Sequence, residues 1–275
     1  MYKELEQQKR GLISSGKYQE LSAEERIILD LPLIMWLKHY YYGAIFMYNW
    51  LVGDGDIVMD DAMFAFLDKW EKKTEAEQEF MQFFKSQKNN AIGKEIEKDG
   101  HKIYALNDVK QYIAQSNADT IRFDSQNFSD GYLNFARCNI SYFGKINDSH
   151  VAAFGTLGLS YIFEGVYNAN NKHIKVTQII QRIKDGFDFE DEDEDENNSQ
   201  RLGVWNSSIF EFDSKINRIK IIPSSKKVTL YNKTFRLFRE NTGLGKDFSI
   251  IGRRKVHSIL DFINIDSTND TVVYK

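Results

Sequence analysis

The sequence predicts an α+β fold in which an N-terminal helical bundle is followed by a mostly antiparallel, curved β-sheet or half-barrel. Residues 1–116 place apolar side chains at three- and four-residue spacing, which is the period of an amphipathic helix. Residues 119–275 contain short runs of β-branched and aromatic residues, separated by Asn, Gly, Asp and Ser. We therefore expect a helical domain over 1–116 and a β-rich domain over 119–275, the latter with an acidic loop at 189–199.

Local signals mark the helices of the first half. Ser22 followed by Glu25 is the pattern of a capping box, which predicts a helix through Leu29. Pro32 suits the first turn of a second helix that runs through Trp50. Apolar spacing predicts further helices over 59–70, 75–84 and 107–114. The aromatic residues of these helices are expected to form the core of the bundle, and they are Trp36, Tyr40, Phe46, Trp50, Phe64, Phe66, Trp70, Phe80 and Phe83.

Residues 31–52 have the length of a membrane-spanning helix. They include Lys38, His39 and Asn49, and they are rich in Tyr and Trp where a span is usually dominated by Leu, Ile and Val. The composition favours a buried or interfacial helix. Membrane insertion, with pore formation as its consequence, is the alternative.

The second half predicts a β-hairpin at its centre. Apolar and polar residues alternate in LGLSYIFEGVYN at 157–168, and the turn-forming Asn168 to Asn171 lead into a long strand from His173. We expect these strands to pair antiparallel and to end at Asp185. Asn232 is expected to cap a short helix that stops before Gly243. Further strands are expected at 120–125, 139–146, 209–212, 216–222, 227–231 and 247–259.

Composition removes several classes of function. The formal net charge is -4, with 36 Lys and Arg against 40 Asp and Glu, so the chain offers no general attraction to nucleic acid. The single cysteine, Cys138, excludes an intramolecular disulfide and a cysteine-based zinc cluster. The glycine-containing segments at 53–57 and 243–248 lack the pattern of a phosphate-binding loop.

The strongest candidate for chemistry is the end of the long strand. Asp185 and Asp188 stand immediately before an unbroken acidic run at 190–196. A carboxylate held at a strand end can activate water or bind a divalent cation such as Mg²⁺ or Ca²⁺. Cleavage of a phosphate ester also needs cationic groups for the phosphoryl oxygens, and the candidates are Arg201, Arg253, Arg254 and His257. Arg253 and Arg254 are consecutive in an expected strand and point to opposite faces, so at most one of them can face a common site. The alternative is a solvated acidic loop without chemistry.

Most of the chain resembles an uncharacterised bacterial family found in type VI secretion and polymorphic-toxin loci. The resemblance covers residues 30–259 and rests on the order of several motifs. They are GAIFMYNWL, DIVMDDAMFAF, LGLSYIFEG, IKDGFDF, LGVWN and TFRLFRENTGLGKDFSI. It implies a context of bacterial competition and no particular chemistry.

The C-terminal half is similar to the activity domain of colicin M-like bacteriocins, which cleave the lipid II peptidoglycan precursor in the periplasm. The family's Asp-x-Tyr-Asp signature is matched by Asp185-Gly186-Phe187-Asp188. The remaining matches are Leu157-Gly158, Gly165, Gly245, Phe248, Ile250, Gly252 and Arg254. The resemblance implies that Asp185 and Asp188 are the functional carboxylates.

Two positions depart from that family. Phe187 replaces the Tyr of the signature, and Glu194-Asp195 stand where a His-Arg pair is expected. Carboxylates in place of cations invert the local charge, which repels a pyrophosphate. Either His257 and Arg201 supply the missing groups, or only the scaffold is shared.

The sequence leads to two hypotheses. The first is an antibacterial effector that acts on the cell envelope and cleaves the phosphodiester or pyrophosphate bond of a lipid-linked peptidoglycan precursor. The second is a non-catalytic adaptor, cargo carrier or immunity protein of the same locus. We expect synthesis in the bacterial cytoplasm without a signal peptide and delivery to the target-cell periplasm. Expected partners are the secretion apparatus or a cognate immunity protein and the lipid-linked precursor, with the membrane surface as a further option.

Overall fold

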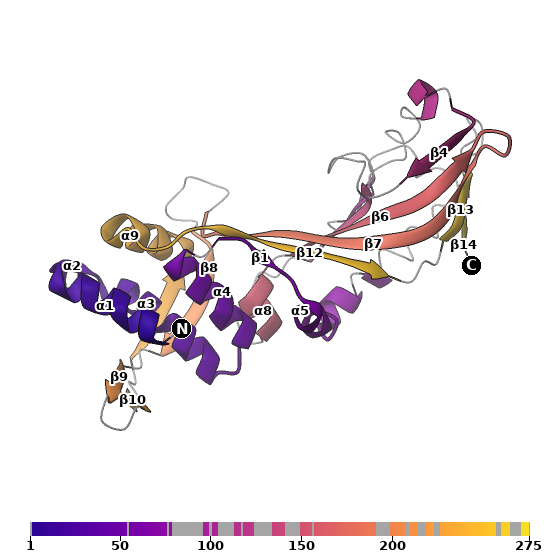
Figure 1. Cartoon of the computed structure of the whole chain (residues 1–275). Coiled ribbons are helices and arrows are strands. Elements are labelled where there is room, and N and C mark those ends of the chain that lie inside the picture. The colour runs from indigo at the N-terminus through magenta and orange to yellow at the C-terminus, as the bar shows by residue number, and fades with distance from the viewer. Residues whose placement is uncertain are drawn as a thin grey trace. The chain divides into compact units, whose positions relative to one another are not determined.

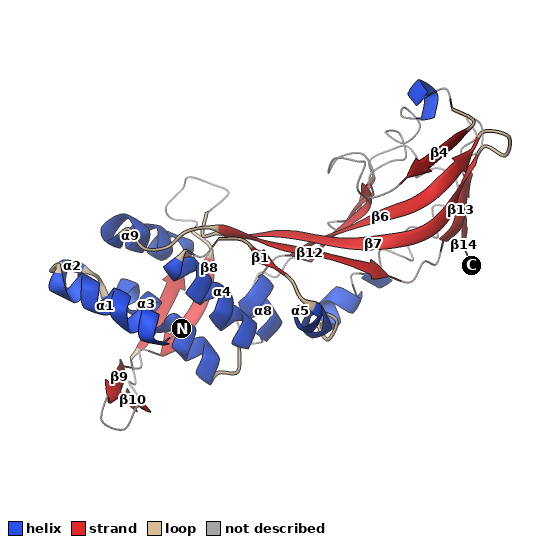
Figure 2. Ribbon diagram, in the orientation of Figure 1, coloured by secondary structure: helices blue, strands red, loops and turns tan. Residues whose placement is uncertain are grey.

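The computed structural model has helices near the N-terminus followed by a curled, mostly antiparallel sheet that forms a half-barrel, which confirms the predicted α+β class (Figures 1 and 2). The structure describes residues 2–53, 55–75, 77–78, 96–98, 101–103, 113–116, 118–123, 134–140, 149–155, 157–190, 199–206, 209–213, 218–222, 226–256, 260–264 and 271–274.

The described helices are short and lie mainly at the start of the chain. They are α1 (Tyr2–Ser14), α2 (Lys17–Glu20), α3 (Ala23–Leu37), α4 (Tyr41–Val52), α5 (Asp61–Leu67), α8 (Ser149–Phe154) and α9 (Asn232–Thr242). The capping box predicted for α3 is confirmed, because the Glu25 amide donates to Ser22 Oγ while the Ser22 amide donates to the Glu25 carboxylate.

The strands form one large sheet and two small ones. The strands are β1 (Ile57–Val58), β2 (Ile96–Lys98), β3 (His101–Ile103), β4 (Thr120–Phe123), β5 (Asn134–Ile140), β6 (Leu157–Asn168), β7 (His173–Phe187), β8 (Arg201–Asn206), β9 (Ile209–Asp213), β10 (Arg218–Ile222), β11 (Lys227–Tyr231), β12 (Phe248–Val256), β13 (Leu260–Asn264) and β14 (Thr271–Tyr274). Among these described strands, the large sheet has the order β1-β12-β7-β6-β5-β3-β2, with β4 on β6 and β13 on β7 and β14. The pairs β9–β10 and β8–β11 stand apart from it.

The predicted hairpin is confirmed as β6 and β7. Asn168 pairs with His173, and the antiparallel register continues to Leu159 opposite Ile183, with a bulge between Glu164 and Gly165. Gly165 has a packing reason, because a Cβ at this position would lie 2.5 Å from the carbonyl oxygen of Lys175. β7 runs to Phe187 and so extends two residues past the expected end at Asp185.

The chain forms two compact units, each made of three segments. The first unit contains Met1–Ile57, Tyr142–Gly155 and Gly186–Ile250, and the second contains Val58–Ser141, Thr156–Asp185 and Ile251–Lys275. Both units therefore draw on residues 1–116 and on residues 119–275. Strands β7 and β12 each contribute residues to both units.

The single helix predicted from Pro32 to Trp50 is wrong, because two helices occupy this part of the chain. Pro32 lies inside α3, where the helix that starts at the Ser22 cap continues through it. The break follows at residues 38–40, where His39 adopts a left-handed φ of 63°. No described helix is both long and apolar enough to span a membrane.

The expected aromatic core is only partly correct. Phe46, Trp50, Phe64 and Trp70 are buried. Trp36 is 46% exposed, so its assignment to the core is wrong, because it lies in the last turn of α3 where the chain breaks. Phe80 and Phe83 lie outside the described residues.

Candidate functional site

The end of β7 and the residues that follow it, Gly186 to Glu190, are anchored in the first unit by Phe187 and Phe189. Phe187 stacks on Phe248 with ring centroids 5.1 Å apart. Phe189 stacks on Phe235 at 3.9 Å and meets the indole of Trp50 edge-on at 4.9 Å. These contacts fix the backbone on each side of Asp188. Phe187, which stands where the resemblance leads one to expect a Tyr, makes an aromatic packing contact.

Two side chains of helix α9 donate hydrogen bonds to backbone carbonyls on the C-terminal side of Asp188. Asn232 Nδ2 donates to the carbonyl oxygen of Glu190 at 3.0 Å, and Arg236 Nη1 donates to that of Phe189 at 3.1 Å. The expectation that Asn232 caps this helix is wrong, because the N-cap residue is Tyr231. The side chain of Asn232 is used for the bond to Glu190 instead. Gly186 completes the arrangement, since a Cβ there would lie 2.6 Å from Asp188 Oδ2.

Asp188 is an exposed residue whose carboxyl group is nevertheless partly shielded by neighbouring atoms. This desolvation raises the pKa of Asp188, and the negative charges of Asp247 and Glu190 act in the same direction. The backbone N–H of Glu190 and the guanidinium of Arg239 oppose that rise in pKa. A carboxyl group whose pKa is raised is a stronger base than an ordinary aspartate, which suits a role in proton transfer.

Arg239 is the cation of this site, and the sequence did not single it out. Its Nη1 and Nη2 donate to Asp247 Oδ2 and Oδ1 at 3.0 and 2.8 Å, and Nη1 lies 3.7 Å from the carboxylate of Glu190. Trp50 Nε1 donates to Asp247 Oδ1 at 3.0 Å, and the guanidinium lies over the indole ring at 5.7 Å. We call Asp188, Glu190, Arg239 and Asp247 the Asp188 cluster.

The Asp188 cluster is unbalanced in charge. Three carboxyl groups share one guanidinium, so the fully ionised cluster carries a surplus of negative charge. A cation, or a proton on Asp188, reduces that surplus. The sequence signal that could have located Arg239 is the run TFRLFREN, in which Phe235 and Phe238 face the core and each is followed by an Arg.

The other predicted site residues have different surroundings. Asp185 is half-buried near the end of β7 and belongs to the second unit, whereas Asp188 belongs to the first. Arg201 is exposed at the start of β8. His257 and residues 191–198, which include most of the acidic run, lie outside the described residues. The grouping of these residues in one site stays a prediction.

Arg254 belongs to a closed ring of side chains in the second unit. Its Nη atoms donate to both carboxylate oxygens of Asp68, and its Nε donates to Gln181 Oε1 at 2.8 Å. Lys73 donates to Asp68 at 2.9 Å and pairs with Glu77 at 2.7 Å, and Gln181 Nε2 donates to Glu77 at 2.7 Å. Lys73 and Gln181 are buried. We call these five residues the Arg254 ring.

Arg254, which the sequence suggested as a ligand of phosphoryl oxygens, is bonded to Asp68 and Gln181 in this ring. Hydrogen bonds from Arg254 and Lys73 lower the pKa of Asp68 to about 2, against the opposing effect of burial. The Arg254 guanidinium also lies 4.7 Å from the ring centre of Phe64. All three nitrogen positions of Arg254 therefore have acceptors within the protein.

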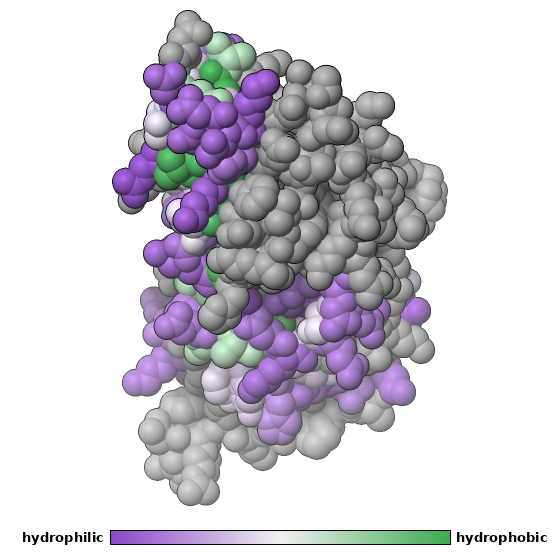
Figure 3. All heavy atoms as spheres, turned by 90° about the vertical axis from the view of Figure 1, so that its right-hand side faces the viewer, coloured by the Kyte–Doolittle hydropathy of each residue, from purple (hydrophilic) through white to green (hydrophobic). Residues whose placement is uncertain are grey.

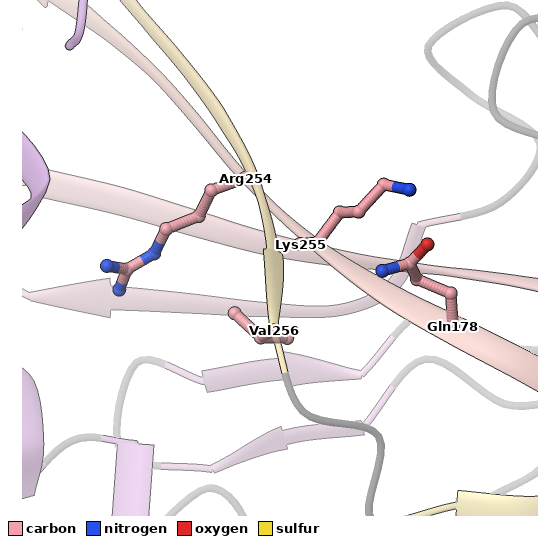
Figure 4. A pocket seen from close by; sticks show the side chains of 4 residues that line it. All are labelled: Gln178, Arg254, Lys255 and Val256. Carbon is pink, nitrogen blue, oxygen red and sulfur yellow. The ribbon is translucent and has the colours of Figure 1, made fainter. Parts of the chain in front are cut away.

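A cavity of about 400 Å³ is lined by residues of β7 and β12 in the second unit. Gln178, Arg254, Lys255 and Val256 line it (Figure 4). Arg254 and Lys255 leave β12 in opposite directions, as Figure 4 shows. Within the described part of the chain, no group of three or more His, Cys, Asp or Glu is arranged to hold a metal ion.

An exposed aromatic corner occurs where α3 ends and α4 begins. Trp36 and Tyr41 are 46% and 43% exposed, and their rings meet edge-on at 4.8 Å. His39 Nδ1 lies 2.6 Å from the Tyr41 hydroxyl, and Leu37 is also exposed. Lys38 extends over the indole of Trp205 at 5.5 Å. We call Trp36, Leu37, His39 and Tyr41 the aromatic corner.

Comparison with known proteins places the chain in a family without assigning it an activity. No curated protein and no solved structure matches the chain. A protein-family model matches residues 28–266, which include the Asp188 cluster, the Arg254 ring and the aromatic corner. The chain therefore belongs to the family of unknown function DUF6402.

Proposed function

We propose that this protein is an antibacterial effector that acts on the cell envelope by cleaving a phosphodiester or pyrophosphate bond of a lipid-linked peptidoglycan precursor. One observation carries the proposal. Asp188, at the end of the signature Asp185-Gly186-Phe187-Asp188, is a carboxyl group of raised pKa in a segment whose backbone is held by Asn232 and Arg236, and the charge of Arg239 acts on it. The motif order of a type VI secretion-associated family and the similarity to the colicin M-like domain support the biological setting.

In the proposed reaction, Asp188 acts as a general base. It takes a proton from water while the water oxygen forms a bond to phosphorus and the bond from phosphorus to the leaving oxygen breaks. The proton then passes from Asp188 to the leaving group or to solvent. The raised pKa of Asp188 increases its basicity. Arg239 is the cation of the Asp188 cluster for the phosphoryl oxygens, in the role that the sequence assigned to Arg201 or Arg254, and it has to exchange its bonds to Asp247 for bonds to the substrate.

The negative surplus of the Asp188 cluster sets a condition on this substrate. A pyrophosphate carries its own negative charge, so its approach to three carboxyl groups is unfavourable unless a cation accompanies it. We expect the substrate to arrive with a bound divalent cation such as Mg²⁺, with Asp188 as the protein group nearest to it. Asp185 remains a second candidate carboxylate.

Expression directed to the periplasm of a sensitive bacterium tests the proposal. The wild type is expected to be toxic and to release the phosphorylated head group of the lipid-linked precursor. Asp188→Asn keeps the size of the side chain and removes the base, so it should abolish both effects at equal protein level. Asp61→Asn, which neutralises an exposed carboxylate of α5, is the matched control and should remain toxic.

Two results would contradict the enzymatic proposal. One is an absence of toxicity for a wild type that is shown to be folded and present in the periplasm. The other is equal toxicity for the wild type and Asp188→Asn. Asp185→Asn is measured in parallel, because its loss of activity alone would move the reaction away from the Asp188 cluster.

The second candidate function is a non-catalytic adaptor, cargo carrier or immunity protein, and the aromatic corner favours it. Exposed Trp and Tyr residues are enriched at the centres of protein interfaces, where each can contribute 2 kcal/mol or more, on the order of a thirtyfold change in affinity. Co-purification from the native operon with Trp36→Ala and Tyr41→Ala together is the test. Leu237→Ala, at a position 48% exposed on α9, is the control.

A partner retained by the wild type and by Leu237→Ala but lost by the double variant supports the binding role. Retention of the partner by all three proteins contradicts it. Toxicity that depends on Asp188 together with no stable partner leaves the enzymatic proposal in place.

A further inference from the structure

The outer face of the β7–β12 strand pair in the second unit concentrates positive charge. The pleat of the two strands determines which residues share a face. On β12, Gly252 and Arg254 face α5 and the residues beside it, because a Cβ at Gly252 would lie 2.9 Å from both Met59 and Phe64, and Arg254 reaches Asp68. On β7, Gln181 and Ile183 share this inner face through their contacts with Arg254 and Gly252.

The residues between them point the other way. Alternation places Arg253 and Lys255 of β12 on the outer face, and Figure 4 shows Lys255 directed away from Arg254 (Figure 4). On β7 the same face carries Arg182 and Lys184, and Lys175 joins them beyond the bulge. We call Lys175, Arg182, Lys184, Arg253 and Lys255 the basic strand face.

Four of the five cations of the basic strand face are accessible. Lys175, Lys184, Arg253 and Lys255 are exposed, and Arg182 is half-buried. No ion pair or hydrogen bond involves the side chains of those four exposed residues in the part of the chain that the structure describes. Glu164, opposite Gln178 on β6, is the carboxylate that the described register of β6 adds to this face.

Cations on neighbouring strands would normally be expected to repel each other. Gln181 contacts Arg254 and Ile183 lies against Gly252, so Arg182 and Arg253 are neighbours across the β7–β12 pair. Like charges placed directly opposite each other destabilise a sheet. The four exposed cations of this face, Lys175, Lys184, Arg253 and Lys255, have no partner among the described residues, and an anionic partner that covers the face would compensate their charge.

The geometry points to an anionic phospholipid surface as that partner: we propose that the basic strand face docks the protein on membranes rich in anionic lipid. The argument is charge complementarity, since Lys and Arg near a bilayer surface are attracted to anionic head groups and their aliphatic stems reach to the interface. Ile251, 38% exposed and two residues before Arg253 on β12, adds an apolar contact at one end of this face.

A membrane surface suits this arrangement better than a polynucleotide. The whole chain has a net charge of -4 and an acidic run at 190–196, which repel a long polyanion that bends around the protein. A bilayer is a flat anionic surface that can contact this one face, and the attraction between exposed charges acts over about 8 Å at physiological salt. On the side of the molecule seen in Figure 3, the described surface is mostly hydrophilic with small separate apolar areas.

This inference rests on the proposed function for its biological meaning, because a lipid-linked precursor is reached from the membrane surface. It does not depend on catalysis. Asp188→Asn should bind membranes as the wild type does, so a catalytic failure and a binding failure are distinguishable in the same set of proteins.

Co-sedimentation of the full chain with lipid vesicles tests the inference. The wild type is expected to bind vesicles containing phosphatidylglycerol and cardiolipin and to bind neutral phosphatidylcholine vesicles much more weakly. Each surface cation contributes about fivefold to the partition constant, so the triple variant Lys184→Gln, Arg253→Gln and Lys255→Gln should bind on the order of a hundredfold more weakly.

The matched control carries the same change of net charge elsewhere. Lys17→Gln, Lys233→Gln and Lys246→Gln neutralise three exposed lysines of the first unit, and this variant should bind anionic vesicles like the wild type. Far-UV circular dichroism checks that both variants are folded. Raising the salt concentration with the wild type gives a test that needs no variant, because electrostatic binding should fall steeply.

Three results would overturn the inference. The first is equal binding of the wild type to anionic and neutral vesicles. The second is equal loss of binding in the two triple variants, which would show an effect of net charge without a specific face. The third is tighter binding to single-stranded DNA than to anionic vesicles under the same salt conditions, which would assign the basic strand face to a nucleic acid.

Discussion

Two neighbouring glycines give a matched pair of substitutions that separates packing from backbone strain. Gly243 and Gly245 adopt positive φ angles of 76° and 94°, which L-residues rarely adopt. Gly243 ends α9 and has open space where a Cβ would be. At Gly245 a Cβ would lie 2.5 Å from Cζ2 and 2.8 Å from Cζ3 of Trp50, a fully buried side chain. An alanine would therefore be strained by the positive φ at both positions, but it would collide with Trp50 only at position 245.

The expected destabilisation follows from these two contributions. Placing Ala in the left-handed region costs about 1–2 kcal/mol, which is the full expected effect of Gly243→Ala. Gly245→Ala adds the overpacking of a filled core, about 1–3 kcal/mol more. We therefore expect Gly245→Ala to lower the free energy of unfolding of the first unit by about 2–5 kcal/mol.

Urea unfolding followed by tryptophan fluorescence and by far-UV circular dichroism measures the difference. The midpoint for Gly245→Ala should fall below that for Gly243→Ala, and Trp50→Phe in the Gly245→Ala background should recover part of the loss by removing the larger ring. Equal midpoints for the two alanine variants would refute the reasoning, because they would show that Gly245 does not pack against Trp50.

Three further predictions concern carboxyl groups. The pKa of Asp68 is lowered to about 2, so the ionised carboxylate stabilises the fold above pH 4. This contribution to the free energy of unfolding is about 1 kcal/mol, because the side chain is 41% exposed, and it is lost as the pH falls from 4 to 2. Asp68→Asn should flatten this part of a curve of stability against pH. Burial raises the pKa of Asp30 to about 6 despite its ion pair with Lys9. Ionisation of Asp30 therefore lowers the free energy of unfolding by about 2–3 kcal/mol as the pH rises from about 4 to 6, and the unfolding free energy of Asp30→Asn should not show this decline. Carboxyl NMR titration should show a lower pKa of Asp188 in Asp247→Asn, which removes a negative neighbour; an unchanged value would show that Asp247 does not contribute to the raised pKa.

The elements that could be predicted from sequence are those with local causes. The β6–β7 hairpin is determined by alternation and a turn cluster, and α3 starts at a capping box, so each signal lies within a few residues of the element it specifies. The break after α3 could not be predicted from residues 31–52, because Pro32 suggested a start, while the break occurs at His39.

The candidate site divides in the same way. Asp188 was identified because a strand end and an acidic run are visible in the sequence. Arg239 and Asp247 were missed because their relation to Asp188 depends on contacts between segments 50 or more residues apart in the chain, which no local pattern contains. Arg254 was assigned to a substrate because its acceptor Asp68 is 186 residues away.

The closed Arg254 ring restricts which substitutions relatives of this chain can accept at its five positions. Each of its five side chains bonds to two others in the ring, so losing one residue leaves two neighbours with an unsatisfied group, and two of the five positions, Lys73 and Gln181, are buried. A substitution at a single position therefore lowers stability, whereas replacing both members of an oppositely charged pair leaves neither group without its partner. Among relatives, positions 68 and 254 should change as a pair, and a chain that has lost the arginine should also have lost the aspartate.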